Sequence, residues 1–105
     1  MIKVSKTKLD SVLLIEPDFF EDHRGDYTEL YNEKLYADHG VAIKFVTDSA
    51  ITSRKNVLRG IHGDVRTWKL INCTHGSMYF VVVNCDEKSP DFGKWESFVL
   101  TDRNK

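Results

Sequence analysis

The chain has 105 residues, of which 41% are hydrophobic and 30% are charged. This length allows one domain with one core, and the composition is globular, which excludes an intrinsically disordered chain. Its 15 basic and 16 acidic residues give a net charge of -1, so nothing in the overall charge attracts nucleic acid or an anionic membrane. An anionic ligand would have to be held by a few well-placed Arg or Lys side chains.

The N-terminal residues and the apolar runs indicate where in the cell the protein is expected. Residues 1–6 contain neither the apolar stretch nor the small-residue cleavage site of a secretory signal. The longest apolar run, Met78 to Val83, fits a buried strand and is too short to cross a membrane. We therefore expect a cytoplasmic protein without a membrane partner. Cys73 and Cys85 are too few for a disulfide framework or a structural zinc site, and we expect free thiols.

In chain order, the first predicted element is a short apolar strand at 12–16, which Pro17 closes. An alternating, β-branched and aromatic segment predicts a second strand at 26–31. One helix is predicted at 32–39, with Asn32 as its N-cap, Leu35 and Tyr36 facing inward, and Gly40 at its end.

The remaining segments also have strand patterns. Strands are predicted at 43–49, 56–62, 67–73, 77–83 and 95–100, with a turn at 86–93 that contains Pro and Gly. The strand at 77–83 is apolar almost throughout, so we expect it to be buried. Many short strands separated by polar turns predict an all-β barrel or sandwich, and the spacing is too short for βαβ crossovers.

The densest group of polar residues lies between Leu58 and Leu70. A hairpin through Gly63 and Asp64 would bring Lys69 near His62. A His beside a Lys suits carbon-acid chemistry, because the imidazole accepts a proton while the ammonium stabilises the enolate oxygen. A surface pair of no catalytic importance has the same spacing.

A second group surrounds Arg24 and Gly25. Gly25 allows a tight turn, and the planar fork of Arg24 could reach a diphosphate. A charged β-turn leading into a strand is the alternative interpretation. The four histidines (His23, His39, His62 and His75) are scattered without the spacing of metal ligands, so no metal site is predicted.

Four segments occur together in one order: Asp22-x-Arg24-Gly25-x-Tyr27-x-Glu29, Val57-Leu58-Arg59-Gly60-Ile61-His62, Lys69-Leu70 and Ser89-Pro90-x-Phe92-Gly93-x-Trp95. In this order and spacing the chain, from about Pro17 to Asn104, resembles the dTDP-4-dehydrorhamnose 3,5-epimerase family. Most rhamnose-pathway members have an aromatic–Gln pair after the His. Here Gly63 and Asp64 follow His62, which resembles the branch that acts on GDP-linked 4-keto heptoses in capsule pathways.

The resemblance implies one cupin-like epimerase domain over residues 1–105. Its fold would be an all-β, cupin-type double-stranded β-helix (a jelly-roll barrel) with one short helix near the N-terminus, and the C-terminal strands of the family's barrel would be missing. It also implies a homodimer with exchanged N-terminal strands, and neither a metal nor an organic cofactor.

The implied activity is an isomerase: epimerisation of a nucleotide-linked 4-keto sugar at C3, C5 or both, in capsule, lipopolysaccharide or O-antigen biosynthesis. His62 matches the catalytic base, and Lys69 matches the cation near the 4-keto oxygen. The other matched positions contact the GDP- or dTDP-linked substrate: Arg24 and Arg59 at the diphosphate, Glu29 and Phe20 at the nucleotide.

The sequence departs from the family in three places. Residues 47–51 replace a Gln-x-Asn-x-Ser pattern that contacts the sugar, and Asn84 replaces an Asp. The family's general-acid Tyr and the Asp that orients its base lie past the position of Asn104. The tyrosines of this chain (Tyr27, Tyr31, Tyr36 and Tyr79) do not match that acid. Two alternatives therefore stay open: a nucleotide-sugar 3,4-ketoisomerase, and a truncated binding module or cupin fragment that does not turn over substrate.

Overall fold

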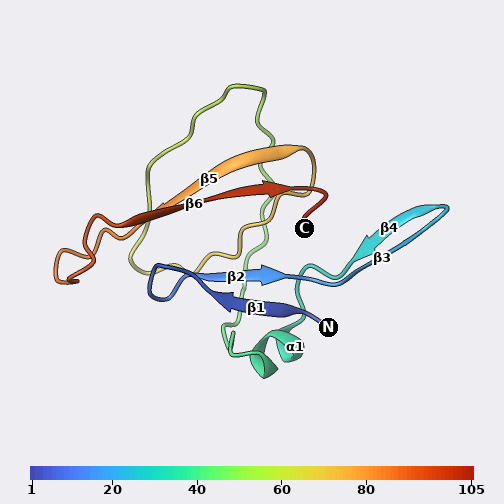
Figure 1. Cartoon of the computed structure of the whole chain (residues 1–105), viewed down its shortest axis with the longest axis horizontal. Helices are drawn as coiled ribbons and strands as arrows, with labels where there is room; N and C mark the ends of the chain where they lie inside the picture. Colours follow the sequence, from blue (N-terminus) through green and yellow to red (C-terminus); the bar gives the residue numbers. More distant parts are fainter.

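The strands of the chain pair only with their neighbours in sequence. The computed structural model describes residues 1–105 and contains three two-stranded antiparallel sheets and one short helix (Figure 1). The elements are β1 (Lys3–Lys6), β2 (Leu13–Glu16), β3 (Phe19–Asp22), β4 (Gly25–Thr28), α1 (Glu33–Asp38), β5 (Ser77–Val83) and β6 (Trp95–Thr101). No helix in the structure has the length and apolar character needed to cross a membrane.

The core lies where α1 packs beside the β1–β2 hairpin. Only Ile2, Leu9, Tyr36 and Val41 are buried, and three of them form one cluster against which Val4, Ile15, Tyr31, Leu35 and Leu70 pack. The core therefore joins residues near the N-terminus to the helix and, through Leu70, to the segment between α1 and β5.

The helix begins and ends as the sequence predicts. The side chain of Asn32 accepts a hydrogen bond from the Leu35 N–H at 2.9 Å, which satisfies one free donor of the first turn. Gly40 follows the C-cap at φ +88°, a conformation that glycine adopts without a Cβ clash. Tyr36 faces inward and is 2% exposed. Its hydroxyl donates to the Leu30 carbonyl at 2.5 Å, which fixes the chain ahead of the helix.

The β3–β4 hairpin extends away from the rest of the molecule (Figure 1). Its register pairs Phe20 with Tyr27 and Asp22 with Gly25, so the tip of the hairpin is the turn through Arg24. Gly25 has φ +131°, where a Cβ would be strained, which explains a glycine at this position. The predicted strand at 26–31 is therefore real but ends at Thr28.

The β5–β6 hairpin is the longest sheet. Seven residue pairs join it, from Ser77 opposite Thr101 to Val83 opposite Trp95. The predicted strands are confirmed, but the predicted burial of β5 is wrong. Alternation places Tyr79, Val99 and Trp95 on one face, and these side chains are 67%, 58% and 59% exposed. No second sheet covers that face.

The segment between α1 and β5 contradicts the prediction most clearly. Residues 41–76 contain no strand, so the strands expected at 43–49, 56–62 and 67–73 are absent. The segment forms one long loop that rises from α1 past β5 and β6 to the top of the view and returns through the middle of the molecule to β5 (Figure 1). A β-strand requires a neighbouring strand for its backbone N–H and C=O groups. Here residues 41–76 pair with no strand, and most of their side chains stay exposed.

Candidate functional site

Two of the six residues matched to the family site line one cavity. Phe20 on β3 and Glu29 just after β4 border a hollow of about 430 Å³. Its other lining residues come from β1, β3, β4 and α1 and their flanks: Met1, Ile2, Asp18, Phe19, Tyr27 and Leu35. The cavity is thus built mainly from apolar and aromatic side chains with two carboxylates at its border.

Aromatic side chains at this cavity are open to solvent. Phe20 and Tyr27 are cross-strand partners, and they are 65% and 67% exposed. Exposed aromatic rings offer a stacking surface for a nucleobase. The carboxylate of Asp18 is bound by the amino group of Met1. Phe19, Asp18 and Tyr27 were not predicted as lining residues; the adjacent aromatic pair Phe19–Phe20 was the available signal.

Arg24 lies at the hairpin tip, where Asp22 occupies its guanidinium fork. Nη2 of Arg24 donates to Oδ2 of Asp22 at 2.6 Å, and the Arg24 backbone N–H donates to Oδ1 at 2.8 Å. These bonds hold the pKa of the Asp22 carboxyl below its usual value and raise the pKa of Arg24. A diphosphate that binds Arg24 must therefore compete with this carboxylate. The predicted turn is confirmed, and it also forms this ion pair.

His62 lies in the irregular segment and folds back on Gly60. The side chain is exposed. Its Cδ2 atom is 3.2 Å from the point where a Cβ on Gly60 would stand. Gly60 itself has φ +90°, so the backbone leaves the extended course of a strand at this residue. The strict alternation expected for 56–62 therefore does not apply.

Arg59 and Lys69 flank His62 in sequence and are also exposed. Nε of Arg59 donates to the hydroxyl of Ser53 at 2.9 Å, which leaves the terminal nitrogens of its fork available. The chain turns at Val65 and Arg66, where Oδ1 of Asp64 accepts the Arg66 N–H at 2.7 Å. This turn joins no strands, so the predicted β-hairpin between His62 and Lys69 is wrong.

The structure therefore divides the predicted site. Phe20 and Glu29 share a cavity, whereas Arg24 stands at a hairpin tip. Arg59, His62 and Lys69 lie along the segment without strands, and none of the three lines the 430 Å³ cavity. The cations matched to the phosphates and to the enolate oxygen therefore do not line the cavity that the two carboxylates border.

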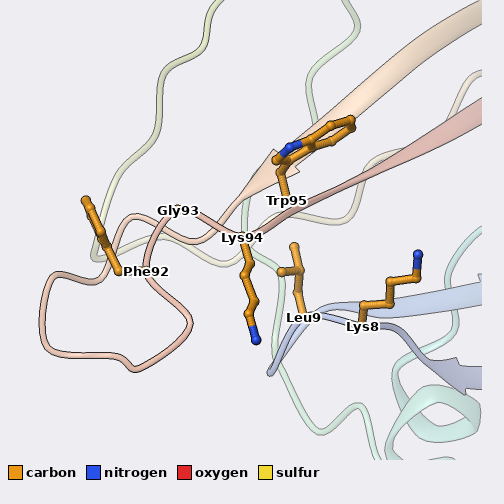
Figure 2. A pocket seen from close by; sticks show the side chains of 6 residues that line it. All are labelled: Lys8, Leu9, Phe92, Gly93, Lys94 and Trp95. Carbon is orange, nitrogen blue, oxygen red and sulfur yellow. The ribbon is translucent and has the colours of Figure 1, made fainter.

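A second hollow, of about 520 Å³, lies between the β1–β2 turn and the β5–β6 loop. Its lining residues are Lys8, Leu9, Phe92, Gly93, Lys94 and Trp95, and Figure 2 shows that their side chains diverge. Nζ of Lys94 is bound to Asp91 at 2.7 Å, and the Lys8 N–H donates to Glu96 at 2.9 Å. This hollow holds none of the residues matched to the family site.

Other candidate groups have structural partners. The hydroxyl of Tyr31 donates to the Ile43 carbonyl at 3.1 Å, as Tyr36 does to Leu30. Asn84, the substitute for the family's Asp, donates to the Ser89 hydroxyl and accepts the Asp86 N–H, so it shapes the loop before β6. No three His, Cys, Asp or Glu side chains are grouped to hold a metal ion.

Comparison with known proteins decides the family. The family model for dTDP-4-dehydrorhamnose 3,5-epimerase matches residues 6–105. The chain belongs to the dTDP-4-dehydrorhamnose 3,5-epimerase family. It is 38% identical to the dTDP-4-dehydrorhamnose 3,5-epimerase of Escherichia coli K12, a match covering 99% of this chain and 58% of that protein. The enzyme of the same description from Methanothermobacter thermautotrophicus is 33% identical, over 95% of this chain and 55% of its own length.

Solved structures of the family have the same fold as this chain. The Bacillus anthracis enzyme, with TDP and PPi bound, matches 99% of this chain with a TM-score of 0.87 and 33% identity. The Legionella pneumophila dTDP-6-deoxy-D-glucose-3,5-epimerase, in complex with dTDP-4-keto-L-rhamnose, matches 100% with a TM-score of 0.91 and 32% identity. The expected all-β, cupin-type fold with one short helix is confirmed. This chain covers 62% and 57% of those two chains.

Proposed function

We propose that this chain takes part in the epimerisation of a dTDP-linked 4-keto sugar at C3, C5 or both. The family match over residues 6–105 carries this proposal. His62, Lys69 and Arg59 lie in the segments whose order and spacing match the family's site. The cavity bordered by Phe20 and Glu29 supports a nucleotide subsite beside β3 and β4.

The proposed chemistry is a proton transfer at carbon. The 4-keto group acidifies C3–H and C5–H, and the His62 imidazole accepts the proton as the C–H electron pair moves into the carbonyl. The ammonium of Lys69 stabilises the resulting enolate oxygen. Return of a proton to the opposite face inverts the centre, so no oxidant or reductant is consumed. Among the tyrosines, only Tyr27 borders the proposed nucleotide cavity, and we assign none of them as the proton donor.

The proposed substrate follows from the chemistry of the matched side chains and from the substrates for which the relatives are named. Arg24 and Arg59 would bind the diphosphate through their planar forks, while Phe20 and Tyr27 would stack on the base. The Escherichia coli and Legionella pneumophila relatives are named for dTDP sugars, which favours dTDP over GDP. The pair Gly63–Asp64 is the one feature that favours a GDP-linked heptose and a capsule pathway. A homodimer with exchanged N-terminal strands and a cytoplasmic location complete the proposal.

A second function, binding without turnover, is favoured by one observation. His62 and Lys69 are exposed and lie outside the cavity that Phe20 and Glu29 border. A base this open to water would have no preorganised, water-excluded site in which to act. In that case the chain would hold a nucleotide sugar without exchanging its protons.

Incubation in deuterated water separates these functions. The protein is mixed with a dTDP-linked 4-keto-6-deoxy sugar, and deuterium at C3 and C5 is followed by NMR, with calorimetry on dTDP and GDP in parallel. Deuterium incorporation with inversion is the result expected of an epimerase. Migration of the carbonyl would identify a 3,4-ketoisomerase, and exchange without inversion would identify a missing proton donor. Binding without exchange would overturn the epimerase proposal in favour of a binding module.

A further inference from the structure

Lys105 contacts three separate parts of the structure. Its ammonium nitrogen Nζ donates to Oδ2 of Asp26 on β4 at 2.7 Å. Its backbone N–H donates to the Thr101 carbonyl of β6 at 3.2 Å, and its carbonyl oxygen accepts from the side-chain amide of Asn72 at 3.1 Å. β6 ends on the side of the molecule from which the β3–β4 hairpin extends (Figure 1). The backbone of Lys105 is therefore anchored on β6 and on the segment between α1 and β5, while its side chain binds the hairpin.

The side chain of Lys105 packs against the hairpin instead of extending into solvent. It is 15% exposed, and Nζ lies 5.9 Å from the centroid of the Phe19 ring, within the range at which an aromatic ring attracts a cation. No other hydrogen bond or ion pair joins residues 19–28 to another part of the structure. Because an ion pair partly removed from water is screened less than an exposed one, the Lys105–Asp26 pair is the polar contact that fixes the hairpin to the rest of the molecule.

Lys105 binds the hairpin on the face opposite to its exposed aromatic pair. By register and strand alternation, Asp26 and Phe19 share one face of the hairpin. The cross-strand partners Phe20 and Tyr27 lie on the other face, and both border the 430 Å³ cavity. Lys105 does not line that cavity. A ligand stacked on Phe20 and Tyr27 could therefore bind while Lys105 keeps its contact with Asp26.

We propose that Lys105 is a positioning residue: through Asp26 it holds the β3–β4 hairpin in the position from which Phe20 and Arg24 bind the nucleotide. This inference rests on the proposed substrate roles of Phe20 and Arg24. A hairpin that is already held loses less conformational freedom when the ligand binds. When the hairpin is released, the fraction of molecules in the binding position falls, and the apparent affinity falls in proportion.

The test compares Lys105→Met with Arg103→Met. Both variants replace a cation after the end of β6 by an apolar side chain, but Arg103 is exposed, whereas Lys105 is bound to Asp26. By calorimetry, the Kd for dTDP should rise about 5-fold in Lys105→Met, the effect expected of one ion pair. In Arg103→Met it should stay within about 2-fold of the wild type. Thermal unfolding checks that both variants are folded.

NMR of the Asp26 carboxyl carbon reports on the contact itself. At neutral pH its signal should move in Lys105→Met, because the carboxylate loses its ammonium partner. The signal should stay in place in Arg103→Met. An Asp26 signal that is the same in Lys105→Met as in the wild type would overturn the ion pair, and the positioning role with it.

A double-mutant cycle separates positioning from direct binding of the ligand. Asp26→Asn removes the same ion pair and leaves Lys105 in place, so the Kd for dTDP should again rise about 5-fold. The double variant should also bind about 5-fold more weakly, and not about 25-fold, because both substitutions remove one interaction. Tighter binding in Asp26→Asn would mean that the released Lys105 binds the diphosphate itself. That result, or equal losses in Lys105→Met and Arg103→Met, would overturn the positioning role.

The positioning role and the proposed function fail in different ways. If the wild type binds dTDP and Lys105→Met binds it equally well, the positioning role is refuted and the nucleotide subsite stands. If the wild type binds no dTDP while the Asp26 signal still responds to Lys105→Met, the nucleotide subsite is refuted. The positioning role would then fall with it, although the ion pair would remain.

Discussion

At the scale of single residues, the charged groups of the candidate site differ in how free they are to bind a ligand. Arg24 is held by Asp22 through its side chain and its backbone N–H. Arg59 has only a hydroxyl partner, Ser53, on one of its nitrogens. Of the two proposed phosphate ligands, Arg59 can therefore bind without first giving up an ion pair.

The Asp22 carboxyl should titrate at a lower pH in the wild type than in Arg24→Gln. The Arg24 guanidinium and then its backbone N–H favour the ionised carboxylate and lower its pKa. Because the folded-state pKa lies below the unfolded value, the stabilisation is present above a pH of about 4 and is lost as the pH falls further. NMR of the carboxyl carbon measures this directly. Part of the shift should survive in Arg24→Gln, since the backbone donor remains; identical titration in the two proteins would contradict the ion pair.

His62→Ala and Arg59→Ala should separate catalysis from binding. Removing the imidazole should abolish deuterium exchange while the Kd for dTDP stays within about 2-fold, because no phosphate contact is lost. Removing the Arg59 fork should raise that Kd by about 10-fold or more. Calorimetry and exchange NMR measure the two effects. Arg54→Ala is the matched control, because it removes the same charge from an exposed side chain of the same segment. Equal losses of affinity in all three variants would contradict the assigned roles.

At the scale of elements, helix-capping and strand patterns in the sequence predicted the elements that form through contacts between residues close in sequence. The N-cap Asn32 and the terminal Gly40 gave the helix its bounds to within one residue. A nearly continuous apolar run located β5, and alternation located β6. The strand β1 was missed because Lys3–Lys6 carries a single apolar residue between lysines. It forms because β2 pairs with it residue by residue, from Lys3 opposite Glu16 to Lys6 opposite Leu13.

The failures at 43–49, 56–62 and 67–73 have another cause. These segments have strand composition, but a strand also needs a partner at about 4.8 Å along its edge. Hydrophobic periodicity and β-propensity are properties of a single segment, whereas strand pairing depends on which segments lie beside it in space. The separation of His62 and Lys69 from the Phe20–Glu29 cavity follows from the same missing pairing. The family motifs therefore indicated candidate site residues in the sequence, but they could not predict how these residues are arranged in space.

Tyr36 should make the stability of the helix region sensitive to alkaline pH. Burial raises the pKa of the Tyr36 hydroxyl, and the negative charge of Glu29 and then the neighbouring Tyr31 add to this. A raised folded-state pKa means that stability is complete below a pH of about 10 and falls as the pH rises above it. Urea unfolding at pH 8 and pH 11 should show a smaller alkaline loss for Tyr36→Phe than for the wild type.

The same substitution has a separate cost near neutral pH. Tyr36→Phe removes the hydrogen bond to the Leu30 carbonyl, and its free energy of unfolding at pH 8 should fall by about 1 kcal/mol. Tyr27→Phe is the control, since its side chain is 67% exposed. An alkaline loss in Tyr36→Phe as large as in the wild type would show that another group controls the transition.

At the scale of the whole molecule, the structure is more open than a compact domain of its mass. Its accessible surface is 9251 Å², whereas a compact monomer of this mass exposes roughly 6,000 Å². Its radius of gyration is 15.0 Å, against about 13 Å for a compact domain of this length. Two regions account for this openness: most side chains of residues 41–76 are exposed, and so are Tyr79, Trp95 and Val99 on one face of β5–β6.

This openness should lower the cooperativity of unfolding. The urea m-value scales with the surface exposed on unfolding. This fold buries about three quarters of the surface that a compact domain of the same mass would bury. The m-value should therefore be about three quarters of that of a compact two-state domain of equal length, measured by circular dichroism under the same conditions.

Small-angle scattering should give a radius of gyration near 15 Å in a dilute concentration series. An m-value at the compact reference together with a radius near 13 Å would mean that residues 41–76 collapse onto the hairpins in solution, and His62 would then lose the open surroundings that leave its imidazole exposed.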